Sequence, residues 1–209
     1  MANGRFGLAG LRRRVLQAMC PTSVRGIRTM ATWLPIAVRS VLHQCSVKWM
    51  DFGSKTLDEP FFDYTLQTLF DLQPPPDQRI TPLRDLIAAA SGVPRTEPAG
   101  LVLHISRCGS TVVVRALQAM SNVLVMSEVS PLLSLFSPPP LVDGRAPYSS
   151  QEREQAIRAV VTLFAAHSRA SAVVIKAHAT SLLHIDYIRA LWPGVPVLIL
   201  IRDPVEVVV

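Results

Sequence analysis

Between residues 100 and 209 the sequence alternates short apolar runs with amphipathic segments, and this alternation constrains the fold most. Runs that are apolar throughout are typical of strands buried on both faces of a parallel sheet. Helices between such strands indicate an α/β domain with a mostly parallel sheet covered on both faces. The expected strands are LVLHIS (101–106), VLVMSE (123–128), VVIKAH (173–178) and VPVLILI (195–201), and the expected helices are 112–120, 151–168 and 182–192.

Two further segments complete this organisation. Residues 131–150 are rich in Ser and Pro, and we expect a loop there. Residues 49–98 are expected to form a short helical arm, with one amphipathic helix at about 60–72 and a second near 82–90. Three consecutive prolines at 74–76 separate the two helices. The aromatic and leucine residues of the first helix have helical spacing, which indicates packing on the main domain rather than a ligand site.

The first 48 residues differ sharply from the rest in charge. They contain eight Lys or Arg residues and no acid, whereas the whole chain has a net charge of +6, so the remainder is slightly acidic. This composition, with an amphipathic pattern at 5–19, is typical of an organelle transit peptide. The alternative is an extension upstream of a true start at Met30. We expect residues 1–48 to hold no strand and to be dispensable for folding. The predicted location is a mitochondrion or plastid if the segment is a transit peptide, and the cytoplasm otherwise.

Composition argues against several classes of function. The positive charge lies in the N-terminal segment and not on the domain, which argues against a nucleic-acid partner. No apolar run approaches the roughly 18–20 residues that a membrane span needs. Three widely spaced cysteines, Cys20, Cys45 and Cys108, give neither a disulfide framework nor a zinc pattern, and no metal site is expected.

Polar residues gather where the expected strands end. In open parallel sheets, ligands bind beyond the carboxyl ends of the strands. We therefore expect the active site at that edge. The strand ends carry Ser106-Arg107, Glu128, Lys176 with His178, and Arg202-Asp203.

The segment SRCGST (106–111), between an expected strand and an expected helix, suits the binding of an anion. Gly109 permits a tight turn, and backbone N–H groups at the helix N-terminus point at the bound anion. Ser110 and Thr111 add hydroxyl donors, and Arg107 adds a fixed positive charge. The lysine of the nucleoside-triphosphate motif GxxxxGK[ST] is absent, which argues against ATP or GTP hydrolysis.

Two other interpretations of this segment exist. A phosphatase loop of the Cys-x5-Arg type fails by one residue, because Val114 stands at the required spacing from Cys108 and Arg115 follows it. The simplest alternative is an ordinary strand–turn–helix unit with an incidental arginine, since short motifs also occur by chance.

The sequence HISRCGST resembles the 5′-phosphosulfate loop of sulfotransferases, in which a Lys or Arg precedes Ser/Cys-Gly-[ST]-Thr. The later ILIRDPVEVVV is similar to the 3′-phosphate segment of that family, a strand that ends in arginine and is followed by a helix. The two motifs lie 95 residues apart in the family's order. An upstream pattern, W…EPFF..T, resembles an uncharacterised branch of sulfotransferase-like proteins. The resemblance covers about residues 49–209.

The resemblance implies that residues 99–209 form a P-loop three-layer sandwich, incomplete at its C-terminus and preceded by the helical arm. It implies 3′-phosphoadenosine 5′-phosphosulfate as donor, no metal, and a hydroxyl or amine of a small molecule, sugar or protein as acceptor. Arg202 would bind the 3′-phosphate. The family usually has a serine eight residues later, beyond Val209, so we expect this chain to be a poor or inactive enzyme. The 5′-phosphosulfate would be held by Arg107, Cys108, Gly109, Ser110 and Thr111.

Sulfuryl transfer also needs a base near the acceptor. Glu128, 21 residues after Arg107, resembles the catalytic Glu of tyrosyl-protein sulfotransferases, and its alternative role is a helix-capping or arginine-paired carboxylate. His178, in a Lys-x-His segment, resembles the base of cytosolic sulfotransferases, and its alternative role is a satisfied polar residue at a strand exit. We slightly favour Glu128, because the arginine-type loop accompanies a Glu base. His104 is expected to be a core histidine.

Other functions remain open from sequence. The chain is alternatively a non-catalytic, truncated nucleotide-binding remnant, or another P-loop transferase or kinase, which the missing lysine argues against. The acceptor cannot be deduced, because acceptor pockets lie in variable loops and the fold alone does not define function.

Overall fold

A four-stranded parallel sheet forms the centre of the fold. The computed structural model describes residues 32–41, 43–203 and 205 of the protein. The strands lie in the order β5-β6-β4-β7, and each neighbouring pair is parallel. The predicted α/β architecture, a parallel sheet flanked by helices, is confirmed. Its strands are β4 (Gly100–His104), β5 (Val123–Ser127), β6 (Ala172–Lys176) and β7 (Val197–Leu200).

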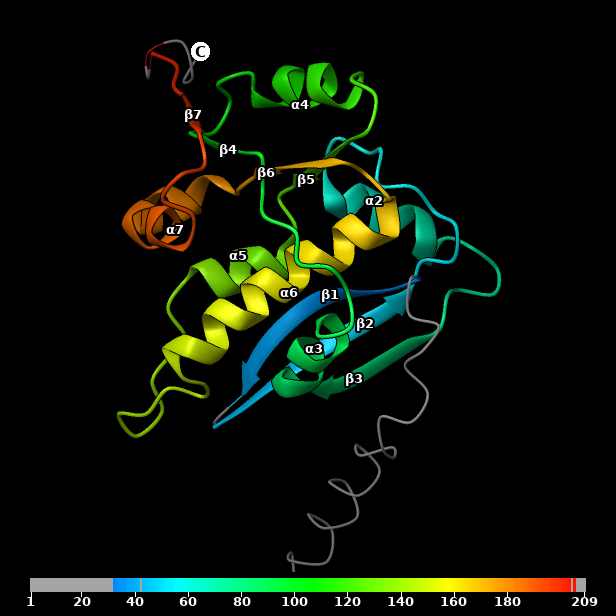
Figure 1. Cartoon of the computed structure of the whole chain (residues 1–209), viewed down its shortest axis with the longest axis vertical. Coiled ribbons are helices and arrows are strands. Elements are labelled where there is room, and N and C mark those ends of the chain that lie inside the picture. The colour runs from blue at the N-terminus through cyan, green and yellow to red at the C-terminus, as the bar shows by residue number, and fades with distance from the viewer. Residues whose placement is uncertain (1–31, 42, 204, 206–209) are drawn as a thin grey trace, which may run out of the picture.

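Helices cover the two faces of this sheet unequally. From β4 the chain crosses to the far strand β5, whereas the later connections return in the opposite direction and end at β7. Because crossovers between parallel strands are right-handed, opposite directions place the connecting helices on opposite faces. One face carries α4 (Ser110–Gln118), and the other carries α5 (Ser130–Phe136), α6 (Ser150–Ser168), the 3-10 helix η2 (Ala179–His184) and α7 (Ile185–Leu191) (Figure 1).

Helix α6 lies at the centre of the core, between the parallel sheet and the rest of the protein. It begins with a capping box, in which the Ser149 side chain accepts from the Glu152 N–H and the Glu152 side chain accepts from the Ser149 N–H. These contacts satisfy backbone groups that a helix start leaves unpaired. The apolar face predicted for this helix is confirmed. Its fully buried residues include Ile157, Val160, Val161 and Phe164.

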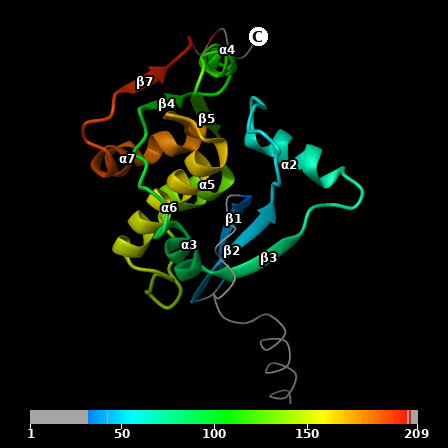
Figure 2. The ribbon, with the colours of Figure 1, turned by 45° about the vertical axis from the view of Figure 1, so that its right-hand side comes forward.

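A second, antiparallel sheet packs on α5 and α6, on their side away from the parallel sheet (Figure 2). Its strands lie in the order β1-β2-β3. In β1 the side chains of Leu34, Ile36 and Val38 are buried, as expected because alternate residues of a strand point to one face. The strands are β1 (Trp33–Val41), β2 (Gln44–Asp51) and β3 (Gln78–Pro82).

The expectation that residues 1–48 hold no strand is wrong. All of β1 and most of β2 lie in this segment and supply core residues. The arginine-rich composition drew attention away from the alternating apolar residues of 34–38, and composition does not decide secondary structure when such a pattern is present. The amphipathic pattern at 5–19 and the start at Met30 lie outside the described residues.

The arm at 49–98 contains both predicted helices, α2 (Phe62–Phe70) and α3 (Leu83–Ala90). It is not purely helical, since it also contains β3. The loop expected at 131–150 is wrong in its first part, where α5 forms. Pro131 suits the first turn of a helix, and the apolar residues that follow it have helical spacing and are buried: Leu132, Leu135 and Phe136.

In the part of the chain that the structure describes, no helix combines the length and apolar character needed to cross a membrane. The helix expected after Arg202 falls mostly on Pro204 and residues 206–209, which lie outside that part.

Candidate functional site

The anion-binding turn expected at 106–111 lies at the carboxyl end of β4 and leads directly into α4. Gly109 is the residue before the helix, and its φ of +85° is a left-handed conformation that favours glycine. No described side chain caps the start of α4, so its first N–H groups are left for solvent or a ligand. Arg107 is exposed and also has a positive φ, of +60°. The turn thus presents backbone donors and a guanidinium at the edge of the sheet.

Arg202 lies beside this turn. β4 and β7 pair in parallel as far as His104 and Leu200, so the residues that follow the two strands leave the sheet together. The Arg202 Nη1 donates to the Arg107 carbonyl oxygen at 3.4 Å, although the two residues are 95 positions apart. The structure therefore brings together the two segments on which the sequence resemblance depends.

Glu128 forms an ion pair with Lys176 that the sequence did not predict. The Lys176 ammonium donates to Glu128 Oε1, and the lysine side chain is 0% exposed whereas that of Glu128 is 19% exposed. Strand pairing fixes this contact, because Lys176 lies opposite Ser127 and its carbonyl accepts from the Glu128 N–H at 2.8 Å. Glu128 itself has a φ of +52°, an uncommon conformation for a non-glycine residue.

His104, expected to be a core histidine, is indeed buried but also contacts Glu128. Its Nε2 lies 3.3 Å from Glu128 Oε1, without the alignment of a hydrogen bond. Its Nδ1 lies 3.0 Å from the Ile105 carbonyl oxygen. Both ring nitrogens therefore lie near oxygen atoms, although only Nδ1 is within a hydrogen bond of its neighbour. His104, Glu128 and Lys176 come from three adjacent strands, β4, β5 and β6.

This cluster sets the charge state of Glu128. Burial alone would raise the pKa of its carboxyl group, but interactions with His104 and Lys176 outweigh that effect and lower the pKa to about 2. A carboxylate with so low a pKa is a weak base. The structure therefore matches the alternative role of Glu128, a paired carboxylate, although its partner is a lysine and not an arginine.

The low pKa of Glu128 gives a testable pH dependence. The folded-state pKa lies below the ordinary value of 4.5, so the stabilisation is present above pH 4.5 and is lost as the pH falls toward 2. We expect the difference in unfolding free energy between wild type and Glu128→Gln to shrink by about 3 kcal/mol across this range. Urea unfolding at several pH values between about 2 and 5 measures it. Glu154→Gln, which removes an exposed ion pair with Arg158, should show less than about 1 kcal/mol of pH-dependent change.

His178, the second candidate base, caps η2. Its Nδ1 accepts from the Thr180 N–H at 3.2 Å and lies 2.9 Å from the Thr180 hydroxyl oxygen. In the neutral ring this contact places the proton on Nε2, so the outer nitrogen is a donor and not a base. The structure matches its alternative role as a satisfied polar residue at a strand exit.

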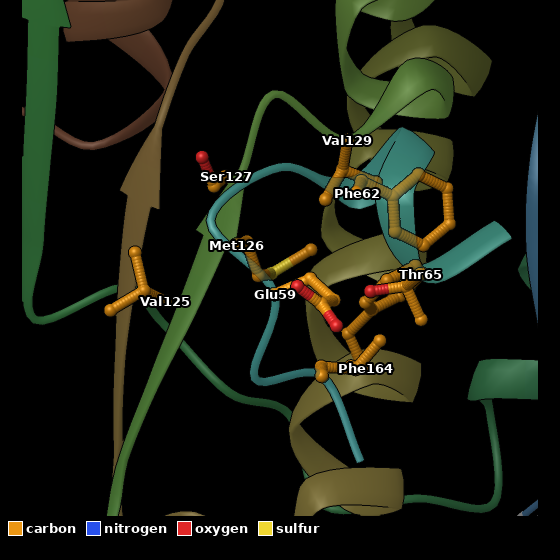
Figure 3. Close-up of a pocket in the computed structure, with 9 residues that line it drawn as sticks. Glu59, Phe62, Thr65, Val125, Met126, Ser127, Val129 and Phe164 are labelled. Carbon is orange, nitrogen blue, oxygen red and sulfur yellow. The ribbon is translucent and has the colours of Figure 1, made fainter. Parts of the chain in front are cut away.

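A small cavity lies between β5, α2 and α6. Its volume is about 10 Å³, close to that needed for one water molecule. Figure 3 shows the Glu59 carboxylate directed into it, near Thr65 and Phe164. The other lining residues shown are apolar except for Ser127. The space is too small for an acceptor molecule.

Sequence reasoning placed Lys176 at the ligand-binding edge but missed its ion pair with Glu128, and it missed the contact of His104 with Glu128. The signals were present, since both residues are polar and end apolar runs, which places them at the ligand-binding edge. In the described residues, no group of three or more His, Cys, Asp or Glu side chains is arranged to hold a metal ion. The candidate ligand-binding groups are therefore the turn at 106–111, Arg202 and the charged cluster beside them.

Comparisons of the chain with protein-family models, with curated proteins and with solved structures found no match. The resemblance to sulfotransferases consequently rests on the motif residues alone.

Proposed function

We propose that the protein is a sulfotransferase, which moves a sulfuryl group from 3′-phosphoadenosine 5′-phosphosulfate to a hydroxyl or amine acceptor. The observation that supports this most is the contact between Arg202 and the Arg107 carbonyl, which joins the two motif segments at one sheet edge. A donor with phosphate groups at both ends of its ribose needs two separate anion-binding points. The turn at 106–111 and Arg202 are two such points.

In this proposal each residue has a defined role. The N–H groups at the start of α4, with Ser110 and Thr111, bind the 5′-phosphosulfate. Cys108 and Gly109 supply backbone to the same turn. Arg107 neutralises the negative charge that develops on the bridging oxygen as the sulfuryl group leaves. Arg202 binds the 3′-phosphate, to which its guanidinium can offer two donors. The chemistry needs no metal.

Neither candidate base is arranged to accept a proton from the acceptor. Glu128 is held by Lys176, and His178 presents a donor rather than a lone pair. For Glu128 to accept a proton from the acceptor, Lys176 would have to move toward the transferring group. This arrangement favours a second candidate function, a nucleotide-binding protein without transfer activity.

Arg107→Ala tests donor binding. We expect the binding free energy of 3′-phosphoadenosine 5′-phosphate, the stable product, to become about 1–3 kcal/mol less favourable, because a charge-assisted hydrogen bond is lost. Isothermal titration calorimetry measures the change. Arg189→Ala, an exposed arginine on α7, is the matched control and should bind as wild type does. Equal affinity in wild type and Arg107→Ala would contradict the proposed role of the turn.

Transfer from labelled donor to phenols, amines and sugars then separates the two candidate functions. Binding with transfer supports the sulfotransferase, and binding without transfer supports the nucleotide-binding protein.

A further inference from the structure

The segment Asp58–Phe61, here called the strap, is attached to the main domain by three consecutive carbonyl groups. Each carbonyl accepts a hydrogen bond from a side chain of α4 or β5. Such a run is unusual for a connecting segment, whose backbone groups commonly face solvent. The three bonds are Arg115 Nη1 to the Asp58 oxygen at 2.9 Å, Gln118 Nε2 to the Glu59 oxygen at 3.0 Å, and Ser127 Oγ to the Pro60 oxygen at 2.6 Å.

The fourth strap residue covers the charged cluster. The Phe61 ring lies over Lys176, with 4.5 Å between its centroid and the ammonium nitrogen. An aromatic face attracts a desolvated cation, so this contact helps to hold Lys176 against Glu128. The strap therefore contacts both halves of the candidate site, the helix that follows the anion-binding turn and the ion pair beneath it.

Helix α4 buries few of its own side chains. Only Ser110 and Val114 of its nine residues are buried. Val112 is 73% exposed. A helix with so few buried side chains gains little from packing, and packing normally supplies most of the stability of a helix. Arg115 and Gln118, in its second half, connect it to the strap.

We propose that the strap positions α4, and with it the anion-binding turn, relative to the Lys176–Glu128 pair. Arg115 and Gln118 are positioning residues that act through the strap and not by contact with donor. This inference rests on the proposed function for its ligand. The strap would fix the distance between the groups that bind the 5′-phosphosulfate and the groups that face the acceptor.

The test combines Arg115→Ala with Gln118→Ala in the full chain. We expect amide hydrogen exchange to accelerate in α4 and the strap but not in α6, because the lost bonds link only the first two. We also expect binding of 3′-phosphoadenosine 5′-phosphate to weaken about tenfold, which corresponds to two ordinary hydrogen bonds. Arg115→Lys, made in place of Arg115→Ala, keeps one hydrogen-bond donor to the strap. It should restore most of the affinity for the nucleotide. Arg189→Ala is again the control and should change neither exchange nor affinity.

The outcomes separate this inference from the proposed function. Unchanged exchange in α4 overturns the positioning role, whether or not the nucleotide binds. Faster exchange in α4 with unchanged affinity overturns its link to the ligand site. If wild type does not bind the nucleotide, the sulfotransferase proposal fails, and the exchange measurement alone still decides whether the strap holds α4.

Discussion

Replacement of Lys176 by methionine is expected to lower the free energy of unfolding by about 3–5 kcal/mol, because it leaves the Glu128 carboxylate partly buried without its main partner. The lysine side chain is completely buried, so no water can take its place without rearrangement of the strand end. His104 remains near the carboxylate, but its Nε2 is not aligned for a hydrogen bond. Urea unfolding at neutral pH measures the loss.

A double variant distinguishes the ion pair from simple loss of packing. Lys176→Met with Glu128→Leu removes both charges, and we expect it to recover most of the stability, since apolar pairs often replace buried ion pairs at little cost. Lys55→Met, at a half-exposed lysine with no ion pair among the described residues, is the control and should change stability by less than about 0.5 kcal/mol. If Lys176→Met proves as stable as wild type, Lys176 and Glu128 do not form the pair in solution.

The parallel sheet was predictable because burial on both faces leaves a continuous apolar run in the sequence. The segments 101–106, 123–128, 173–178 and 195–201 each carry this signal, and each overlaps a strand of the structure. β7 is the exception in burial, since Leu198 and Ile199 are about half exposed. Helix α6 was predictable for a related reason. One long helix that faces the core needs an apolar stripe at helical spacing, and its N-terminus is marked by Ser149 and Glu152.

The antiparallel sheet was harder to predict because its signals are short and mixed with basic residues. In β1, apolar residues alternate at 34, 36 and 38, but Pro35 lies between them and the pairing with β2 shifts at that point. A proline inside a run counts against a strand in the sequence, although it is tolerated at edges and bulges. β1 is an edge strand of its sheet, so tertiary context decides in its favour.

The location of the site was predictable from the sequence, but the contacts between its side chains were not. The rule that ligands bind at the carboxyl edge identified Glu128, Lys176 and Arg202. Which of these side chains are in contact depends on the order of the strands in the sheet. No local sequence pattern determines that order. Because β6 lies between β5 and β4, Lys176 has Glu128 on one side, while β7 on the far side of β4 brings Arg202 to the turn at 106–111.

Deletion of residues 1–48 is expected to abolish cooperative folding. The sequence suggested that this segment is dispensable, but the structure reverses the expectation, because the deletion removes β1 and most of β2. Among the side chains lost are Leu34, Ile36, Val38 and Val47, each no more than 5% exposed. Loss of even one large buried aliphatic side chain costs about 2–5 kcal/mol, so the loss of several exceeds the roughly 5–15 kcal/mol by which a domain is stable. Circular dichroism during thermal unfolding should show no cooperative transition in the deleted chain.

Point variants in β1 test the same conclusion without removing the segment. Ile36→Ala should destabilise the protein by about 2–4 kcal/mol, because its side chain is buried in the core beneath α5 and α6. Arg39→Ala, at an exposed position of the same strand, should cost less than about 0.5 kcal/mol. If Ile36→Ala is as stable as Arg39→Ala and the deleted chain still unfolds cooperatively, β1 is not part of the core in solution. The basic composition of residues 1–48 would then again be the better guide to their role.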